Sequence, residues 1–118
     1  MTRRIVLIED DPDIAALVRE MLTEVGHEVD VRSELPDGVD ADAQLVITDL
    51  LALRSYDPET ARAWIARVRA AFPQATIIVS TAHAPAAADA PALGADAVLT
   101  KPFDVAVFTR TVETLLGA

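Results

Sequence analysis

Short apolar runs recur along this chain and are separated by segments with helical periodicity. The runs fall at residues 5–8, 45–48, 76–79 and 97–99, and β-branched residues are frequent in them. Continuous apolar runs of this length are typical of parallel strands that are covered on both faces. A fifth run, residues 28–32, alternates between polar and apolar residues, which predicts a half-exposed strand at the edge of the sheet.

Three of the intervening segments carry apolar residues on one helical face. The stripes are Ile14, Leu17, Val18, Met21, Leu22 and Val25; Ala61, Trp64, Ile65, Val68 and Phe72; and Val105, Phe108, Val112, Leu115 and Leu116. Asp11, Asp57 and Asp104 are suited to cap the helix starts, and Gly26 and Pro73 mark the ends of the first two helices. Strands that alternate with such helices predict a parallel sheet with helices on both faces.

Two connecting segments fit this alternation poorly. Residues 35–42 contain proline and glycine and show little periodicity, so a helix there should span one or two turns at most. Pro85 and Pro91 bracket residues 86–90, and an interior proline costs a helix about 3 kcal/mol. We therefore expect a shortened second helix and a short, irregular fourth helix.

Composition limits the classes of function. The 118 residues are 52% hydrophobic, which fits one globular domain over 1–118 with no separate output domain. The absence of cysteine excludes disulfides, thiolate metal sites and cysteine nucleophiles. No apolar run approaches the ~18 residues of a membrane span, so we expect a soluble, cytoplasmic protein. A net charge of −9 opposes direct binding to nucleic acid or to an anionic membrane.

Polar residues gather where the predicted strands end. Glu9 and Asp10 follow the first strand, Asp49 the third, Thr81 closes the fourth, and Lys101 follows the fifth. In open parallel sheets, ligands bind beyond the carboxyl ends of the strands. These acids, the hydroxyl and the amine should therefore converge on one edge of the sheet.

The charges of this set favour a bound cation. Two carboxylates about 4 Å apart repel each other by about 4 kcal/mol at an effective dielectric constant of 20. Glu9, Asp10 and Asp49 together carry −3, and Lys101, the chain's single lysine, reduces this to −2. Ligands that are all oxygens select a hard ion, and Mg²⁺ with several retained waters fits best. The first two acids would also suit an ordinary solvated turn before a helix.

With these residues in place, the chain resembles the receiver domains of bacterial two-component response regulators, the CheY-like family, over nearly its whole length. The matching pieces are residues 5–12 (IVLIEDDP), 45–49 (LVITD), 77–82 (IIVSTA), 94–96 (GAD) and 100–103 (TKPF). The resemblance implies a doubly wound, flavodoxin-like α/β fold with five parallel strands in the order 2-1-3-4-5, flanked by five helices.

The resemblance also implies a role for each site residue. It makes Asp49 the carboxylate that is phosphorylated by a sensor histidine kinase or a phosphotransfer protein. Glu9 and Asp10 become the acid pair that holds Mg²⁺, Asp10 directly and Glu9 through water, together with Asp49 and the backbone carbonyl of Leu51 at the family's third protein ligand position. Such a protein is a signalling switch that acts on a downstream protein partner.

Two further residues correspond to groups that contact the phosphoryl group in this family. Thr81 matches the hydroxyl that donates a hydrogen bond to it, and Lys101 matches the ammonium group that pairs with it. With Asp49, they form the set that catalyses self-phosphorylation and dephosphorylation. The resemblance therefore implies no enzyme activity toward a separate substrate.

Departures from the family pattern leave two other functions open. Val98 stands where an aromatic switch residue is common, and residues 50–56 lack the usual Pro-Gly turn. Both features favour a degenerate receiver that acts as a phosphorylation-independent interaction module. A phosphohydrolase similar to the haloacid dehalogenases is a third possibility. Residues 11–14 lack the threonine of its first motif, however, and no late acid pair follows Lys101.

Overall fold

One five-stranded sheet organises the chain. The computed structural model describes residues 3–49, 57–82, 84–101 and 104–116. The strands are β1 (Arg4–Ile8), β2 (Glu28–Arg32), β3 (Leu45–Thr48), β4 (Thr76–Thr81) and β5 (Ala97–Thr100). All neighbouring pairs are parallel, in the order β2-β1-β3-β4-β5. The predicted doubly wound α/β fold and its strand order are confirmed.

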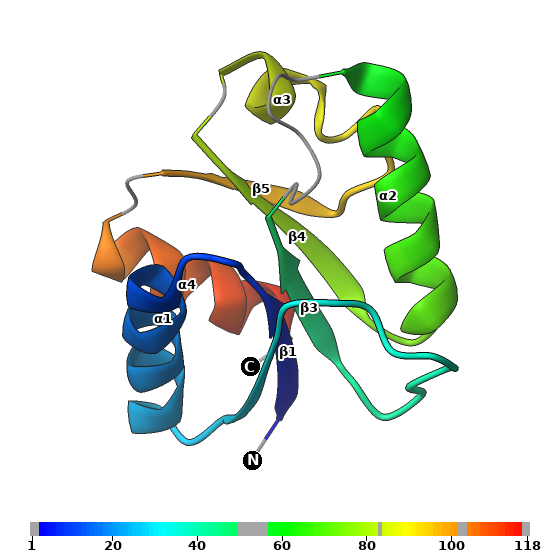
Figure 1. Ribbon diagram of the computed structural model, residues 1–118. Helices are drawn as coiled ribbons and strands as arrows, with labels where there is room; N and C mark the ends of the chain where they lie inside the picture. The colour runs from blue at the N-terminus through cyan, green and yellow to red at the C-terminus, as the bar shows by residue number, and fades with distance from the viewer. Residues whose placement is uncertain (1–2, 50–56, 83, 102–103, 117–118) are drawn as a thin grey trace.

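Helices cover both faces of this sheet (Figure 1). They are α1 (Pro12–Glu24), α2 (Pro58–Ala71), α3 (Ala84–Asp89) and α4 (Val105–Leu115). Helices α1 and α4 lie on one face, and α2 and α3 lie on the other. Among the described helices, none has the length and hydropathy needed to cross a membrane.

The ends of the helices follow from the sequence. Asp11, Asp57 and Asp104 precede α1, α2 and α4, and each carboxylate accepts hydrogen bonds from backbone N–H groups of the first turn. Gly26 lies just after α1 with a φ of 93°, a left-handed conformation that side chains disfavour. The predicted capping residues are therefore confirmed.

Residues of each central strand alternate between two separate cores. Along β1, Ile5 and Leu7 pack on the side of α1 and α4, whereas Val6 and Ile8 pack on the side of α2 and α3. All four side chains are at most 2% exposed. Burial on both faces explains why the central strands have continuous apolar sequences. In β2, by contrast, Val31 is exposed, as expected at an edge.

The connection from β2 to β3 differs from what the resemblance implied. Residues 33–44 form turns and bends, so the described part of the chain has four helices instead of five. Pro36, Gly38 and the weak periodicity of this segment explain the missing helix, since none of them supports a helical turn. Leu35 packs against the core under α2 in its place. Helix α3 includes Pro85 in its first turn and ends before Pro91, and its short length agrees with the expected irregular helix.

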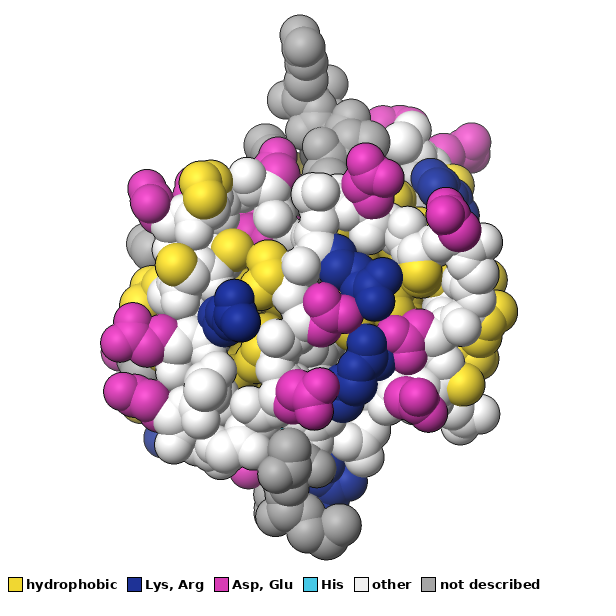
Figure 2. Space-filling view, turned by 60° about the horizontal axis from the view of Figure 1, so that its bottom comes forward, with side chains coloured by type: hydrophobic (Ala, Val, Ile, Leu, Met, Phe, Trp, Pro, Cys, Tyr) yellow, Lys and Arg dark blue, Asp and Glu magenta, His cyan; other side chains and the backbone are white. Residues whose placement is uncertain are grey.

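Ion pairs link the segment after β2 to the strands. Arg4 contacts Asp30 at 3.2 Å and Asp40 at 2.7 Å, and Arg32 contacts Asp30 at 2.9 Å. Burial raises the pKa of Asp40, but the hydrogen bond from Arg4, the positive charge of Arg4 and two backbone hydrogen bonds together outweigh burial and lower this pKa overall. Figure 2, seen from below the view of Figure 1, shows basic side chains closely surrounded by acidic ones.

A buried histidine joins α4 to the turn after α1. Nε2 of His27 lies 2.7 Å from Oε1 of Glu113, although the two residues are 86 positions apart. The side chain of His27 is 4% exposed, so this contact closes the end of the core between α1 and α4. Sequence patterns had given this histidine no role.

Candidate functional site

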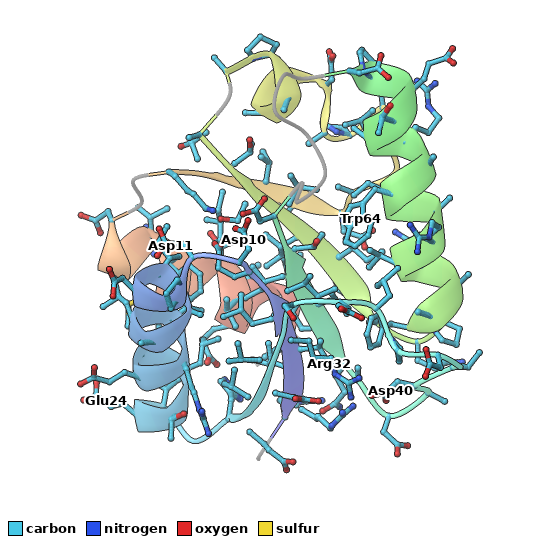
Figure 3. All side chains as sticks on the ribbon, in the orientation of Figure 1. Asp10, Asp11, Glu24, Arg32, Asp40 and Trp64 are labelled. Atoms are coloured by element: carbon cyan, nitrogen blue, oxygen red, sulfur yellow. The ribbon has the colours of Figure 1, made fainter. Side chains whose placement is uncertain are left out.

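The carboxyl ends of three strands bring the predicted acids and the lysine together. Glu9 follows β1, Asp49 follows β3 and Lys101 follows β5. Asp10 comes next after Glu9, in the loop that leads into α1 (Figure 3). Because all the strands are parallel, these positions meet at one edge of the sheet.

Short distances within this group define the site. One carboxylate oxygen from each of Glu9, Asp10 and Asp49 lies within 4.8 Å of the others. Nζ of Lys101 donates a hydrogen bond to Oε1 of Glu9 at 2.7 Å and to Oδ2 of Asp49 at 3.4 Å. The side chain of Glu9 is only 2% exposed, whereas that of Asp49 is 21% exposed. The expected convergence of these four residues is therefore present.

Thr81 ends β4 at the same edge and is buried. Its backbone carbonyl accepts a hydrogen bond from the N–H of Lys101 at 2.8 Å, which anchors the residue that follows β5. Leu51, whose carbonyl was predicted to be a metal ligand, lies outside the described residues. The chemical roles assigned to Thr81 and Leu51 stay predictions.

Burial and mutual contact set the charges of the two central carboxyl groups. Burial and the hydrogen bond with Glu9 outweigh the opposing effect of Lys101 and raise the pKa of Asp49 to about 7. Burial also raises the pKa of Glu9, but its bonds with Asp49 and Lys101 outweigh that effect and lower it overall. Of these two carboxyl groups, Asp49 is therefore the one that takes up a proton more readily as pH falls.

Lys101 stays cationic in this pocket. Burial lowers the pKa of its ammonium group, but the hydrogen bond to Glu9 and the charge of Asp49 raise the pKa overall. An ammonium group held between two carboxylates is available to any anionic group that reaches Asp49.

Comparison with known proteins identifies the architecture. Searches with protein-family models and of curated protein sequences each found no match. A response regulator receiver protein from Burkholderia phymatum is 26% identical, with 98% of this chain and 95% of that one aligned and a TM-score of 0.74. The receiver domain of a LuxO repressor protein from Vibrio parahaemolyticus is 21% identical over 99% and 92%, with a TM-score of 0.75. The chemotaxis protein CheY4 of Vibrio cholerae is 20% identical over 98% and 99%, with a TM-score of 0.74.

The chain has the receiver-domain fold. The family resemblance carried by the five sequence pieces is thus confirmed, although overall sequence identity is low. The acid cluster stands at the carboxyl edge of the sheet, where ligands of such open sheets bind.

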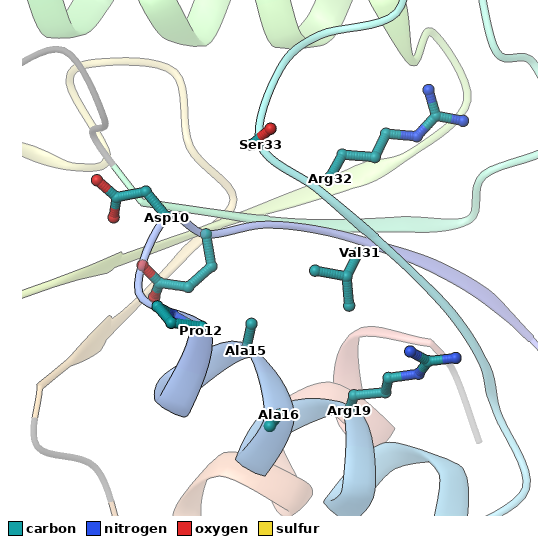
Figure 4. A pocket seen from close by; sticks show the side chains of 9 residues that line it. Asp10, Pro12, Ala15, Ala16, Arg19, Val31, Arg32 and Ser33 are labelled. Atoms are coloured by element: carbon teal, nitrogen blue, oxygen red, sulfur yellow. The ribbon is translucent and has the colours of Figure 1, made fainter.

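A surface groove leads to the acid cluster. It runs between α1 and β2, with Ala15, Ala16 and Val31 along it and Asp10 at its end (Figure 4). Asp10 is exposed, so its carboxylate faces solvent at the end of this groove.

The donor atoms suit a hard divalent cation. Glu9, Asp10 and Asp49 offer three carboxylate oxygens, and this described set includes no histidine. Ligands of this kind favour Mg²⁺ or a similar ion over zinc or copper. A cation there would also offset the negative charge that Lys101 leaves uncompensated.

One contact beside Asp49 was missed by sequence reasoning. Trp64 follows the apolar stripe of α2, which predicted core packing alone, and Figure 3 shows its ring pointing from α2 toward the sheet. Its Nε1 donates a hydrogen bond to Oγ1 of Thr48 at 3.0 Å. A buried hydroxyl requires a partner, so a threonine in the apolar run 45–48 was the available signal.

The effect of substituting Asp49 on the free energy of unfolding should depend on pH. The pKa of Asp49 is about 7 instead of 3.8, so the folded chain binds more protons between these values, and ionisation of Asp49 costs stability as pH rises. We expect Asp49→Asn to be more stable than the wild type by about 1–3 kcal/mol at pH 8, and equally stable at pH 4. Urea unfolding in EDTA at both pH values measures this difference.

The control for that measurement is Asp42→Asn, at an exposed carboxylate near the opposite end of the sheet. It should have the same small effect on the free energy of unfolding at both pH values. A gain for Asp49→Asn that is equal at pH 4 and pH 8 would contradict the raised pKa of Asp49.

Proposed function

We propose that this chain is a phosphoacceptor switch of a two-component or phosphorelay system. Asp49 accepts the phosphoryl group from a sensor histidine kinase or a phosphotransfer protein, and the signal passes to a downstream protein partner. The observation that carries this proposal is the position of Lys101 Nζ, 2.7 Å from Glu9 and 3.4 Å from Asp49, beside a third acid. The receiver-domain fold supports the same role.

The transfer itself needs little covalent work from the protein. An oxygen of Asp49 attacks the phosphorus of a phosphohistidine as the P–N bond breaks, and the imidazole leaves with the bonding electron pair. Lys101 pairs with the phosphoryl oxygens, and the Thr81 hydroxyl donates a hydrogen bond to one of them. In the separate dephosphorylation step, water attacks phosphorus as the bond from phosphorus to the Asp49 oxygen breaks, so the Asp49 carboxylate is restored and inorganic phosphate is released.

Magnesium fits the acids that surround Asp49. Asp10 and Asp49 would hold Mg²⁺ directly and Glu9 through a water molecule, with the carbonyl of Leu51 as the third protein ligand that the family resemblance implies. When bound, the ion supplies positive charge for the phosphoryl oxygens. Glu9 and Asp10 thus serve to keep that charge next to the nucleophile.

Removal of divalent ions should stop phosphorylation. The product carries about two negative charges where the Asp49 carboxylate carried one, so it needs a compensating cation more than the reactant does. We expect negligible labelling by acetyl phosphate in excess EDTA and full recovery when Mg²⁺ is added. The circular dichroism spectrum should be the same in both conditions, and efficient labelling in EDTA would refute the metal requirement.

A phosphorylation-independent interaction module is the second candidate. The missing helix in 33–44 and the half-buried Val98, which cannot swing as an aromatic ring would, favour it. Titration with beryllofluoride and Mg²⁺, followed by amide NMR, separates the two functions. Shifts centred on Asp49, Thr81 and Lys101 support the switch, whereas an unchanged spectrum at saturation supports the module.

A further inference from the structure

The peptide groups on both sides of Asp49 are held by hydrogen bonds. Its N–H donates to the carbonyl of Ile8 at 3.1 Å, which continues the pairing of β1 with β3. Its own carbonyl accepts a hydrogen bond from Oγ1 of Thr48 at 2.7 Å. Because peptide groups are planar, fixing both of them sets the direction in which the Asp49 side chain leaves the backbone.

The hydroxyl of Thr48 is itself oriented by a side chain from another element. Thr48 is fully buried, and Trp64 of α2 donates its indole N–H to Oγ1 at 3.0 Å. A hydroxyl has a single proton, so accepting from the indole leaves that proton for the Asp49 carbonyl. The guanidinium carbon of Arg67 lies 5.5 Å from the centre of the indole ring, a cation–π contact that restrains the ring.

We propose that Thr48 and Trp64 are positioning residues for Asp49, acting through the hydrogen-bond chain from the indole to the hydroxyl to the Asp49 carbonyl. This inference rests on the proposed role of Asp49 as the phosphoacceptor. In-line attack on phosphorus depends on the direction of the nucleophile, and a displacement of about 1 Å costs on the order of a hundredfold in rate. These hydrogen bonds couple the direction of the Asp49 side chain to α2, which lies on the face of the sheet opposite α1 and α4.

Packing alone does not explain these two side chains. The other residues of β3 are apolar, and an apolar side chain at position 48 would fill the same space without burying a hydroxyl. A buried hydroxyl is costly unless it is bonded, and here both of its bonds lie on the path to Asp49.

The rate of labelling by acetyl phosphate in saturating Mg²⁺ tests the proposal. Thr48→Val removes the hydroxyl at nearly constant shape and should slow labelling about tenfold, the factor expected for one lost hydrogen bond. Thr48→Ser keeps the hydroxyl and should label at close to the wild-type rate. Thr111→Val is the matched control, because it deletes a 2.8 Å hydrogen bond within α4, away from Asp49.

A double variant separates positioning from loss of packing. Trp64→Phe keeps an aromatic ring without the indole N–H and should slow labelling about threefold. In the Thr48→Val background it should have no further effect, because Trp64 acts through Thr48. The proposal would be overturned if the double variant slowed labelling by the product of the two single effects. It would also be overturned if Thr48→Val were labelled at the wild-type rate, or if Thr48→Ser were labelled as slowly as Thr48→Val.

The indole proton gives a readout that is independent of labelling. Trp64 is the only tryptophan, so its Nε1–H gives one signal in the proton–nitrogen spectrum. Thr48→Val should shift this signal and speed its exchange with water, whereas Thr48→Ser should not. An unchanged signal in Thr48→Val overturns the hydrogen-bond chain even if the wild type is never labelled. Absent wild-type labelling would by itself refute only the role of Asp49.

Discussion

Asp49→Asn should abolish formation of the acyl phosphate, with labelling reduced at least about 10³-fold. Asparagine fills nearly the same space, but its amide lacks the anionic oxygen that attacks phosphorus. Asp49 is the acid that Lys101 contacts at 3.4 Å and that remains 21% exposed to an incoming donor. Intact-protein mass spectrometry after incubation with acetyl phosphate and Mg²⁺ measures the product, and treatment with hydroxylamine identifies it as an acyl phosphate.

The matched control is Asp104→Asn. Asp104 caps α4, and asparagine caps a helix about as well as aspartate, so this variant makes the same chemical change without harming the fold. It should be labelled at the wild-type rate. Persistent labelling of Asp49→Asn, or equal loss in both variants, would contradict the assignment of the nucleophile.

Lys101→Met should impair both labelling and stability. Methionine keeps the length of the side chain but leaves Glu9, whose side chain is 2% exposed, facing Asp49 without an ammonium group. We expect labelling to slow by about 10²-fold or more, since one stabiliser of the phosphoryl charge is lost. In EDTA at pH 8, the free energy of unfolding should fall by about 3 kcal/mol.

Acidic pH should relieve this loss of stability. When the ammonium group is absent, the pKa values of Glu9 and Asp49 rise, and a bound proton replaces the missing cation as pH falls. The deficit of Lys101→Met should therefore shrink between pH 8 and pH 5. Lys101→Arg keeps the charge in a wider, planar group, so it should recover more stability than labelling rate. Wild-type stability and labelling in Lys101→Met would refute the proposed pocket.

Much of the fold and the acid cluster could be predicted because local patterns encode them. Continuous apolar runs mark strands buried on both faces, and residues such as Asp11 mark the starts of helices. Once the strands are known to be parallel, the residues after them must share one edge. Glu9, Asp49 and Lys101 therefore meet there although they are far apart in sequence.

Contacts between remote side chains could not be predicted in this way. The bond from Trp64 to Thr48 depends on where α2 lies on the sheet, and the contact of His27 with Glu113 joins residues 86 positions apart. Such pairings between distant residues leave no periodic pattern in the amino-acid sequence. The missing helix in 33–44 was only half predicted, because proline and glycine weaken a helix without fixing what replaces it.

The two separate cores have an evolutionary consequence. Neighbouring residues of β1, such as Ile5 and Val6, belong to opposite layers, so the layers share a backbone but no side chains. A substitution beneath α1 and α4 is accommodated by neighbours that do not touch α2. Natural selection can thus reshape the contact surface on one side of the molecule while the other side keeps its partner.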